Sequence, residues 1–126
     1  MDTLLHLADP QLWAAAADTG SYTGSTKGRS LVEEGFVHCS FESQLAGVAA
    51  AIYAGTRALV LLEIDPERLA GTPVRVEPVP GSTERFPHVY GPIPTAAVTS
   101  ATQVQVDEQG RIRPAGAQED TVEVAE

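Results

Sequence analysis

The sequence predicts a single α+β domain, and three observations support that prediction. The chain has 126 residues, a length that suits one folded unit. Its composition, 43% hydrophobic and 20% charged, is that of a globular protein rather than a disordered one. Short stretches of strand-type alternation are mixed with short stretches of helix-type spacing, so the chain is neither all-helical nor all-strand.

The first two expected elements are a strand and a helix. Residues 3–8 are apolar on both sides of His6, which indicates a strand. Asp9 and Pro10 then supply an N-cap and a first helical residue. The alanine-rich stretch that follows is expected to be helical up to Gly20, which is placed to end the helix.

Residues 20–28 are expected to form a loop, and a short strand follows it. Three glycines and four serines or threonines among these nine residues disfavour a packed element. One helical turn is expected at residues 30–34. Residues 35–40 read GFVHCS, and the period of two in a strand places His38 and Ser40 on one face.

A second helix and the strand after it are expected to form the centre of the core. Residues 41–54 repeat apolar side chains at helical spacing, with Ser40 as the expected N-cap and Gly55 as the end. Residues 58–64 are almost continuously apolar, which is typical of a central strand. The helical residues expected in the core are Leu45, Val48 and Ile52.

Three further strands are expected over residues 74–79, 86–91 and 97–106, where apolar side chains alternate or cluster between turn residues. The domain is assigned to residues 1–113. Residues 114–126 contain four acidic residues and no lysine or arginine. This segment is therefore expected to be an acidic disordered tail.

Charge and cysteine content disfavour several classes of protein. The formal net charge is −9 and the basic residues are scattered singly, so no nucleic-acid partner is expected. The longest apolar run is far shorter than the roughly 20 residues that span a bilayer, so no membrane association is expected. Cys39 is the only cysteine, so no intrachain disulfide can form. A cytoplasmic location and a small-molecule ligand are expected, and the oligomeric state stays open.

All three histidines lie inside expected strands. Taken singly, His6, His38 and His88 are each explained as buried, hydrogen-bonded core residues. Together they favour a polar cleft, because His38 shares a strand face with Ser40 and His88 shares one with Tyr90. A zinc site built from the three imidazoles is an alternative, but no closely spaced histidine pair supports it, so no metal is expected.

Four other side chains need separate interpretation. Glu77 lies within the apolar segment VRVEPV, so its carboxylate points either to water or into the cleft. Tyr22 lies in the glycine-rich loop, which favours a pocket wall over the core, whereas Trp13 is expected in the core. Cys39 points away from its neighbour His38, which favours an inert buried thiol.

The residues as a set resemble a bacterial family, the domain-of-unknown-function family 952. The likeness spans about residues 3–106 and rests on SLVEEGFVHCS at 30–40, the strand VLLEID, VRVE, and FPHVYGPI at 86–93. That family is similar in fold to the ADP-ribosyltransferases, whose bent, split sheet holds NAD in its cleft. The resemblance therefore implies a strongly bent, split antiparallel sheet with a few short helices, and ADP-ribosyl transfer or NAD hydrolysis as the activity.

The resemblance also implies roles for individual residues. His6 would contact a ribose hydroxyl, and Glu77 would stabilise an oxocarbenium-like centre as the nicotinamide bond breaks. The expected catalytic residues are His6, His38, Glu77 and His88. The expected substrate-binding residues are Tyr22, Ser40 and Tyr90. No cofactor is required, and NAD is expected as a substrate; a non-catalytic module that binds a small metabolite is the alternative.

Overall fold

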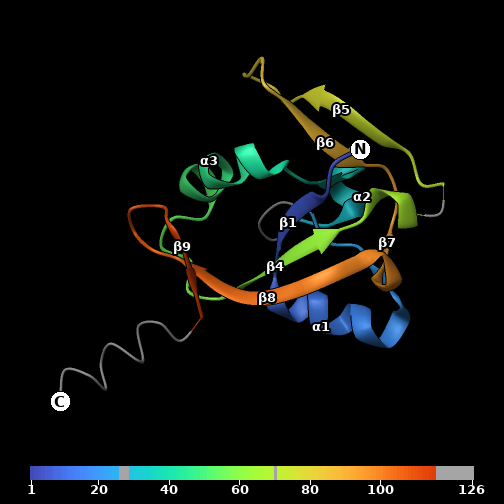
Figure 1. Ribbon diagram of the computed structural model, residues 1–126, viewed down its shortest axis with the longest axis horizontal. Helices are drawn as coiled ribbons and strands as arrows, with labels where there is room; N and C mark the ends of the chain where they lie inside the picture. The colour runs from blue at the N-terminus through green and yellow to red at the C-terminus, as the bar shows by residue number, and fades with distance from the viewer. Residues whose placement is uncertain (26–28, 70, 116–126) are drawn as a thin grey trace.

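The largest element of the protein is a four-stranded antiparallel sheet with the strand order β1-β4-β8-β9 (Figure 1). A computed structural model describes residues 1–25, 29–69 and 71–115. Strand β4 is almost wholly apolar and lies in the interior of the sheet, as expected. The strands are β1 (Leu4–Ala8), β4 (Leu59–Ile64), β8 (Val98–Val106) and β9 (Ile112–Pro114).

A three-stranded antiparallel sheet, in the order β3-β6-β5, adjoins the edge of the first sheet. Leu5 of β1 and Ser40, which follows β3, exchange two backbone hydrogen bonds with N···O distances of 2.8 and 2.7 Å. We call this junction the seam. The two sheets together form one strongly curled antiparallel sheet, which confirms the α+β class and the bend. The second sheet contains β3 (Val37–His38), β5 (Val74–Pro78) and β6 (Arg85–Val89).

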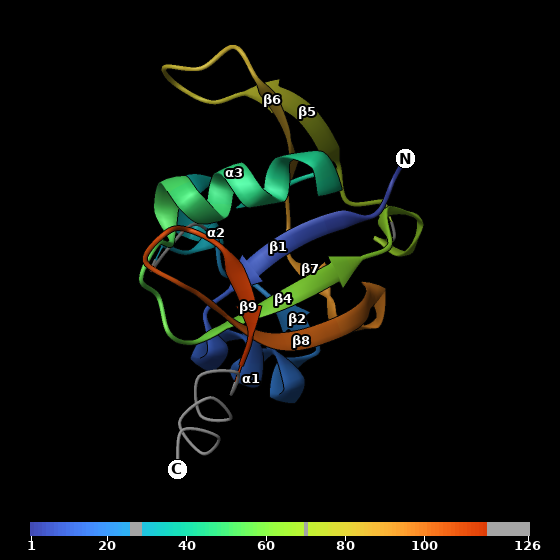
Figure 2. The same cartoon turned by 60° about the vertical axis from the view of Figure 1, so that its left-hand side comes forward.

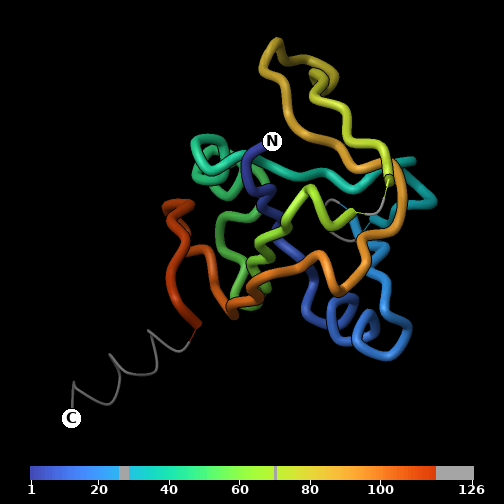
Figure 3. The backbone as a smooth tube through the Cα atoms, turned by 45° about the vertical axis from the view of Figure 1, so that its right-hand side comes forward, coloured from blue at the N-terminus to red at the C-terminus, as the bar shows by residue number. Residues whose placement is uncertain are grey.

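The hairpin of β5 and β6 projects from the rest of the molecule (Figure 3). Helices α1 and α3 instead cover opposite faces of the four-stranded sheet (Figure 2). Among the described residues, no helix has the length and apolar character needed to cross a bilayer. The helices are α1 (Pro10–Thr19), α2 (Leu31–Glu34), α3 (Glu42–Ile52) and the 3-10 helices η1 (Pro66–Arg68) and η2 (Thr95–Ala97).

The ends of α1 confirm the local signals in the sequence. The side chain of Asp9 accepts hydrogen bonds from the N–H groups of Gln11 and Leu12. Gly20 ends the helix in the left-handed region with φ 83°, and its N–H donates to the carbonyl of Ala16. The N-cap of α3 is Phe41 rather than Ser40. The reason is that the Ser40 backbone is already paired with β1 in the seam.

The core has one layer on each face of β4. On the α1 face, Leu62 and Ile64 are fully buried in a cluster with Ala16. On the α3 face, Leu59 packs with Ala49 and Tyr53. The apolar residues of α3 that were expected at the centre of the core are only partly buried, because their side chains line a crevice between α3 and β1. That expectation is wrong for Leu45, Val48 and Ile52.

Two expected irregular segments are partly structured. Within the expected loop, Ser21–Tyr22 forms β2 and pairs with β7 (Ile93–Pro94), while residues 26–28 lie outside the described part of the chain. Near the C-terminus, Pro114 belongs to β9 and lies opposite Val104, so the sheet extends beyond the expected domain end. The remainder of the expected tail, residues 116–126, lies outside the described residues.

Candidate functional site

Three side chains from adjoining strands form a hydrogen-bonded series. Because β3 and β6 pair antiparallel, His38 lies opposite His88, and His38 Nδ1 is 3.2 Å from His88 Nε2. In the β5–β6 pair Glu77 lies opposite Phe86, so the alternation of side chains puts Glu77 and His88 on the same face. His88 Nδ1 is 2.9 Å from Glu77 Oε2. We call the series Glu77, His88, His38 the relay.

Tyr90 supplies a second donor to the carboxylate of the relay. Its hydroxyl donates to Glu77 Oε2, the oxygen that also faces His88. The hydrogen bond from Tyr90, which has the larger effect, and the hydrogen bond from His88 hold the pKa of Glu77 below its usual value. The same contact raises the pKa of Tyr90. Glu77 is therefore ionised at neutral pH, and none of the described residues donates to its other oxygen, Oε1.

The partners determine where the protons of the relay lie. An ionised carboxylate only accepts hydrogen bonds, so His88 donates from Nδ1 to Glu77. In a neutral His88 ring Nε2 must then accept, which makes His38 Nδ1 the donor. A lone pair remains on His38 Nε2, and no group of the described residues donates to it.

Burial determines the charge of His38. Burial, the largest cause, and the neighbouring His88 together lower the pKa of His38 to about 4, with Glu34 acting in the opposite direction. His38 is therefore neutral at pH 7, with its Nε2 lone pair available to a proton donor.

Two phenylalanines shield the relay from water. Phe36 stacks on His88 with ring centroids 4.0 Å apart and planes 16° apart, and Phe86 lies 5.1 Å from the ring of His38. His88 is 1% exposed as a result. Neither phenylalanine was recognised as part of a site from the sequence. Each lies two residues before a histidine of the relay, and that spacing is the signal that could have found them.

His6 lies outside the relay, and both of its ring nitrogens are occupied. Its Nδ1 is 2.6 Å from the backbone oxygen of His38, and its Nε2 is 2.8 Å from the hydroxyl oxygen of Tyr22. The carbonyl only accepts, so Nδ1 donates to it and Tyr22 donates to Nε2. Burial lowers the pKa of His6 to about 4, partly offset by the carbonyl. His6 therefore has no free nitrogen for the expected ribose contact.

Tyr22 is a core residue rather than the wall of a pocket. Its side chain is fully buried, and burial raises its pKa. The expected role was wrong because composition indicated a loop, whereas the hydrogen bond to His6 holds β2 against the sheet. Trp13 packs beside Tyr22, with ring centroids 6.2 Å apart, and is partly buried against the core.

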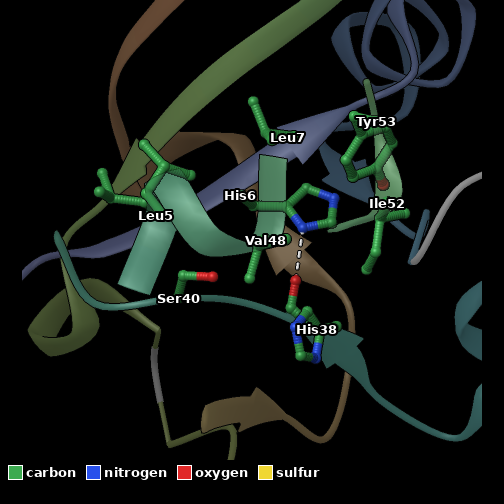
Figure 4. A pocket seen from close by; sticks show the side chains of 9 residues that line it. Leu5, His6, Leu7, His38, Ser40, Val48, Ile52 and Tyr53 are labelled. Atoms are coloured by element: carbon green, nitrogen blue, oxygen red, sulfur yellow. Dashed lines mark hydrogen bonds between the residues drawn. The ribbon is translucent and has the colours of Figure 1, made fainter. Parts of the chain in front are cut away.

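A narrow crevice under α3 brings His6, His38 and Ser40 together (Figure 4). Its volume is about 10 Å³, room for about one water molecule. Ser40 is 2% exposed, and apolar side chains of α3 form the roof. His38 lines the crevice and also ends the relay. His38 therefore lies between the crevice, which His6 and Ser40 also line, and the hydrogen-bonded network of Glu77, His88 and Tyr90.

The geometry does not support a thiol nucleophile or a three-histidine zinc site. Cys39 is 1% exposed on the side of the strand opposite His38, and burial raises its pKa to about 12. Within the described ranges, no group of three or more histidine, cysteine, aspartate or glutamate side chains is arranged to hold a metal ion. His6 cannot serve as the third ligand, because its nitrogens face Tyr22 and a carbonyl.

Comparisons with known proteins agree with the resemblance in the sequence. The crystal structure of protein CC0527 from Caulobacter crescentus is 28% identical, covers 94% of this chain and 97% of that chain, and has a TM-score of 0.73. The solution NMR structure of CC0527 is 29% identical over the same shares, with a TM-score of 0.70. A search of curated proteins found no match. Residues 7–101 match the model of the family described as "Protein of unknown function (DUF952)", so this chain belongs to the DUF952 family.

Proposed function

We propose that this protein binds a small polar molecule beside His38 and acts on it by general acid–base catalysis. The observation that supports the proposal is the relay: an ionised carboxylate, a buried imidazole, and a second imidazole whose outer nitrogen is unoccupied. A general base needs a lone pair at the reacting atom and a group behind it that stabilises the charge it acquires. His38 Nε2 supplies the first, and His88 with Glu77 supplies the second.

In the proposed step, His38 Nε2 takes a proton from a hydroxyl group of the substrate or from water. The His38 ring becomes a cation, and its Nδ1–H hydrogen bond to His88 strengthens. Glu77 stabilises this charge through His88, while Tyr90 holds the carboxylate in place. The deprotonated oxygen forms a bond to the reacting carbon of the substrate as the bond from that carbon to the departing group breaks. His38 then gives its proton to the departing group if that group leaves as an anion, or to water if it leaves neutral, as nicotinamide does, and the relay regains its starting state.

NAD or a related ribosyl nucleotide is the substrate class that we propose first, with ADP-ribosyl transfer or NAD hydrolysis as the reaction. The curled, split sheet supports this choice, since the ADP-ribosyltransferases, to which the family 952 resemblance points in fold, hold NAD in the cleft of such a sheet. The role of Glu77 changes from the sequence expectation. Its Oε2 is engaged by two donors, so Glu77 acts through His88 rather than on an oxocarbenium-like centre directly.

The low pKa of His38 favours a second candidate, a non-catalytic binding module. An imidazole with a pKa of about 4 is a weak base at neutral pH but still a hydrogen-bond acceptor. A small metabolite with a hydroxyl or N–H group would then be held at Nε2 without proton transfer. The small crevice requires either kind of ligand to sit at its mouth or to displace side chains of α3.

Calorimetry followed by a turnover assay tests both candidates. The wild-type chain is titrated with NAD, ADP-ribose and nicotinamide up to about 1 mM, and release of nicotinamide is then followed. We expect Glu77→Gln to lower kcat roughly 100-fold with little change in affinity. The control Glu84→Gln, on the same hairpin but outside the relay, should change neither. No heat with any ligand contradicts the NAD proposal, and binding without turnover favours the binding module.

A further inference from the structure

The outer edge of strand β5 is open. In the order β3-β6-β5 this strand pairs only with β6, and the views in Figures 1 and 2 show the hairpin standing clear of the main body. No segment of the described residues pairs with that edge. Val76, at the middle of the strand, is 37% exposed. An exposed edge strand offers unpaired backbone groups to a further strand.

Pro87 identifies the backbone groups that face outward. It lies opposite Val76, has no N–H, and its carbonyl accepts from Cys39 on the far side of β6 at 3.0 Å. Val76 and Pro87 are therefore a non-hydrogen-bonded pair. Antiparallel alternation then directs the backbone groups of Arg75 and Glu77 toward β6, and those of Val76 away from it.

The outward groups of Val76 lack a strong partner. Its carbonyl is approached by Arg85 Nη1 at 3.5 Å, which is long for a hydrogen bond. None of the described groups accepts its N–H. Pro78, two residues further on, has no N–H, so a strand added here forms its central hydrogen bonds at Val76.

Strand β5 is complementary to itself when two copies run antiparallel. With Val76 opposite Val76 of the partner subunit, the two residues exchange a closely spaced pair of backbone hydrogen bonds. Arg75 then lies opposite Glu77 of the partner subunit, and Glu77 lies opposite Arg75 of the partner subunit. Opposite charges directly across a strand pair stabilise it, and like charges destabilise it.

We propose that two copies of this chain associate through antiparallel pairing of β5 about Val76. A second copy is favoured over an unrelated strand because its charges match at both flanking positions. The pairing joins two three-stranded sheets across a two-fold axis. It also places the partner's Arg75 beside the carboxylate of the relay, whose Oε1 has no described donor. The proposal does not depend on the proposed activity.

Analytical ultracentrifugation of the full chain, from about 10 μM to about 1 mM, tests the proposal, because so short an interface is expected to be weak. Val76→Pro removes the outward N–H without touching the β5–β6 hydrogen bonds, and proline is tolerated at such an edge position. We expect it to raise the dissociation constant at least about tenfold. The control Val76→Thr, which keeps the N–H and the branched side chain, should associate like the wild type.

Charge reversal provides a second test that does not depend on how the proline variant folds. Arg75→Glu places carboxylates opposite each other and should weaken association, while Arg75→Glu combined with Glu77→Arg should restore it. A wild-type chain that stays monomeric at about 1 mM overturns the proposal. Association that neither Val76→Pro nor Arg75→Glu weakens also overturns it, by assigning the contact to another face.

Disulfide trapping tests the register. In a hydrogen-bonded antiparallel pair the Cα atoms lie about 5.5 Å apart, within the range of about 4.4–6.8 Å that a disulfide spans. Val76→Cys should therefore form a covalent dimer under mild oxidation. Val32→Cys, at a position 91% exposed on α2, is the matched control, and the native Cys39 is buried. Equal trapping of the two variants would exclude this register.

Discussion

Burial keeps the His6 ring neutral in the folded protein, so the free energy of unfolding depends on pH through this residue. Its pKa is about 4 in the folded chain and about 6.5 when unfolded. As the pH falls the unfolded chain binds the proton first, so His6 contributes fully to stability above pH 6.5 and loses that contribution as the pH falls toward 4. His38 acts in the same direction.

We therefore expect the free energy of unfolding to fall by about 2 kcal/mol from His6 alone between about pH 6.5 and pH 5, above the range in which most carboxylates titrate. Urea titrations at these two pH values measure the loss. His6→Gln, whose side chain does not titrate, should lack this share of the change and keep the share that His38 contributes. An undiminished loss in that variant would assign the pH dependence to other groups.

The hydroxyl of Tyr22 donates the hydrogen bond that satisfies a buried acceptor, His6 Nε2. Tyr22→Phe removes the hydroxyl that donates to His6 Nε2 and leaves that nitrogen buried without a donor. We expect a loss of about 1–3 kcal/mol in the free energy of unfolding, measured by urea titration at pH 7. A loss below about 0.5 kcal/mol would mean that water replaces the hydroxyl and reaches His6 Nε2.

At the scale of elements, the turn between β8 and β9 packs unusually close to α3. Gly110 has φ +85°, and a Cβ added there would lie 2.6 Å from the Cα of Ala50. Gly81 shares the positive φ, but a Cβ added there has no atom within 4 Å. The two glycines therefore separate backbone strain from steric conflict.

We expect Gly110→Ala to destabilise the protein by about 2–5 kcal/mol, the sum of about 1–2 for the left-handed conformation and about 1–3 for the contact with α3. Gly81→Ala should cost only the first part, about 1–2 kcal/mol. Thermal or urea unfolding of both variants makes the comparison. Equal losses would show that the turn moves away from α3 freely.

The difference between β4 and α3 in burial gives a second prediction at this scale. Leu62 is fully buried, whereas Ile52 is partly buried beside the crevice. Leu62→Ala should cost about 2–5 kcal/mol, and Ile52→Ala clearly less, because less apolar surface returns to water and the site is already open. Denaturant titration compares them, and a larger cost at Ile52 would place α3 at the centre of the core after all.

At the scale of the whole molecule, the last strand of the described residues, β9, is part of the packed structure. Ile112 packs in the α3-side cluster, and Pro114 pairs with Val104. Deleting residues 116–126, which include four acidic residues and no basic ones, should leave the melting temperature within about 4 °C of the wild type. Deleting residues 112–126 removes β9 as well and should lower it further, as calorimetry would measure. Equal melting of the two truncated chains would contradict a structural role for β9.

Much of the fold followed from local signals, because those signals act within a few residues. The caps of α1 and the apolar run of β4 required no knowledge of distant partners. The position of Tyr22 was missed because a hydrogen bond to His6, sixteen residues away, outweighs the loop-forming composition around it. The partial exposure of α3 was missed because helical spacing predicts a buried face but not how deeply it is buried.

The sequence predicted which residues form most of the candidate site, but not how those residues contact one another. The sequence indicated His38, His88, Glu77 and Tyr90, and the structure places all four in one hydrogen-bonded network. His6 was grouped with them because it is a third histidine in an apolar strand. Its separation from the relay depends on which nitrogen meets which partner, and no pattern of residue types encodes that.

The seam has a consequence for how the molecule opens. The described backbone hydrogen bonds between β1 and the segment after β3 are the two that Leu5 and Ser40 exchange, with the imidazole of His6 beside them. Two backbone hydrogen bonds are few for a junction between sheets, so we expect the β3-β6-β5 sheet to separate before the larger sheet unfolds, although Val37 and Val89 must then leave the core cluster that they share with Leu62. Amide hydrogens of β6 should then exchange with deuterium by subglobal opening, well before those of β4 at the same pH. Their protection, relative to the intrinsic exchange rate at each pH, should fall in mild acid as His6 acquires its proton. The region that carries the relay would be the less protected cooperative unit of the protein.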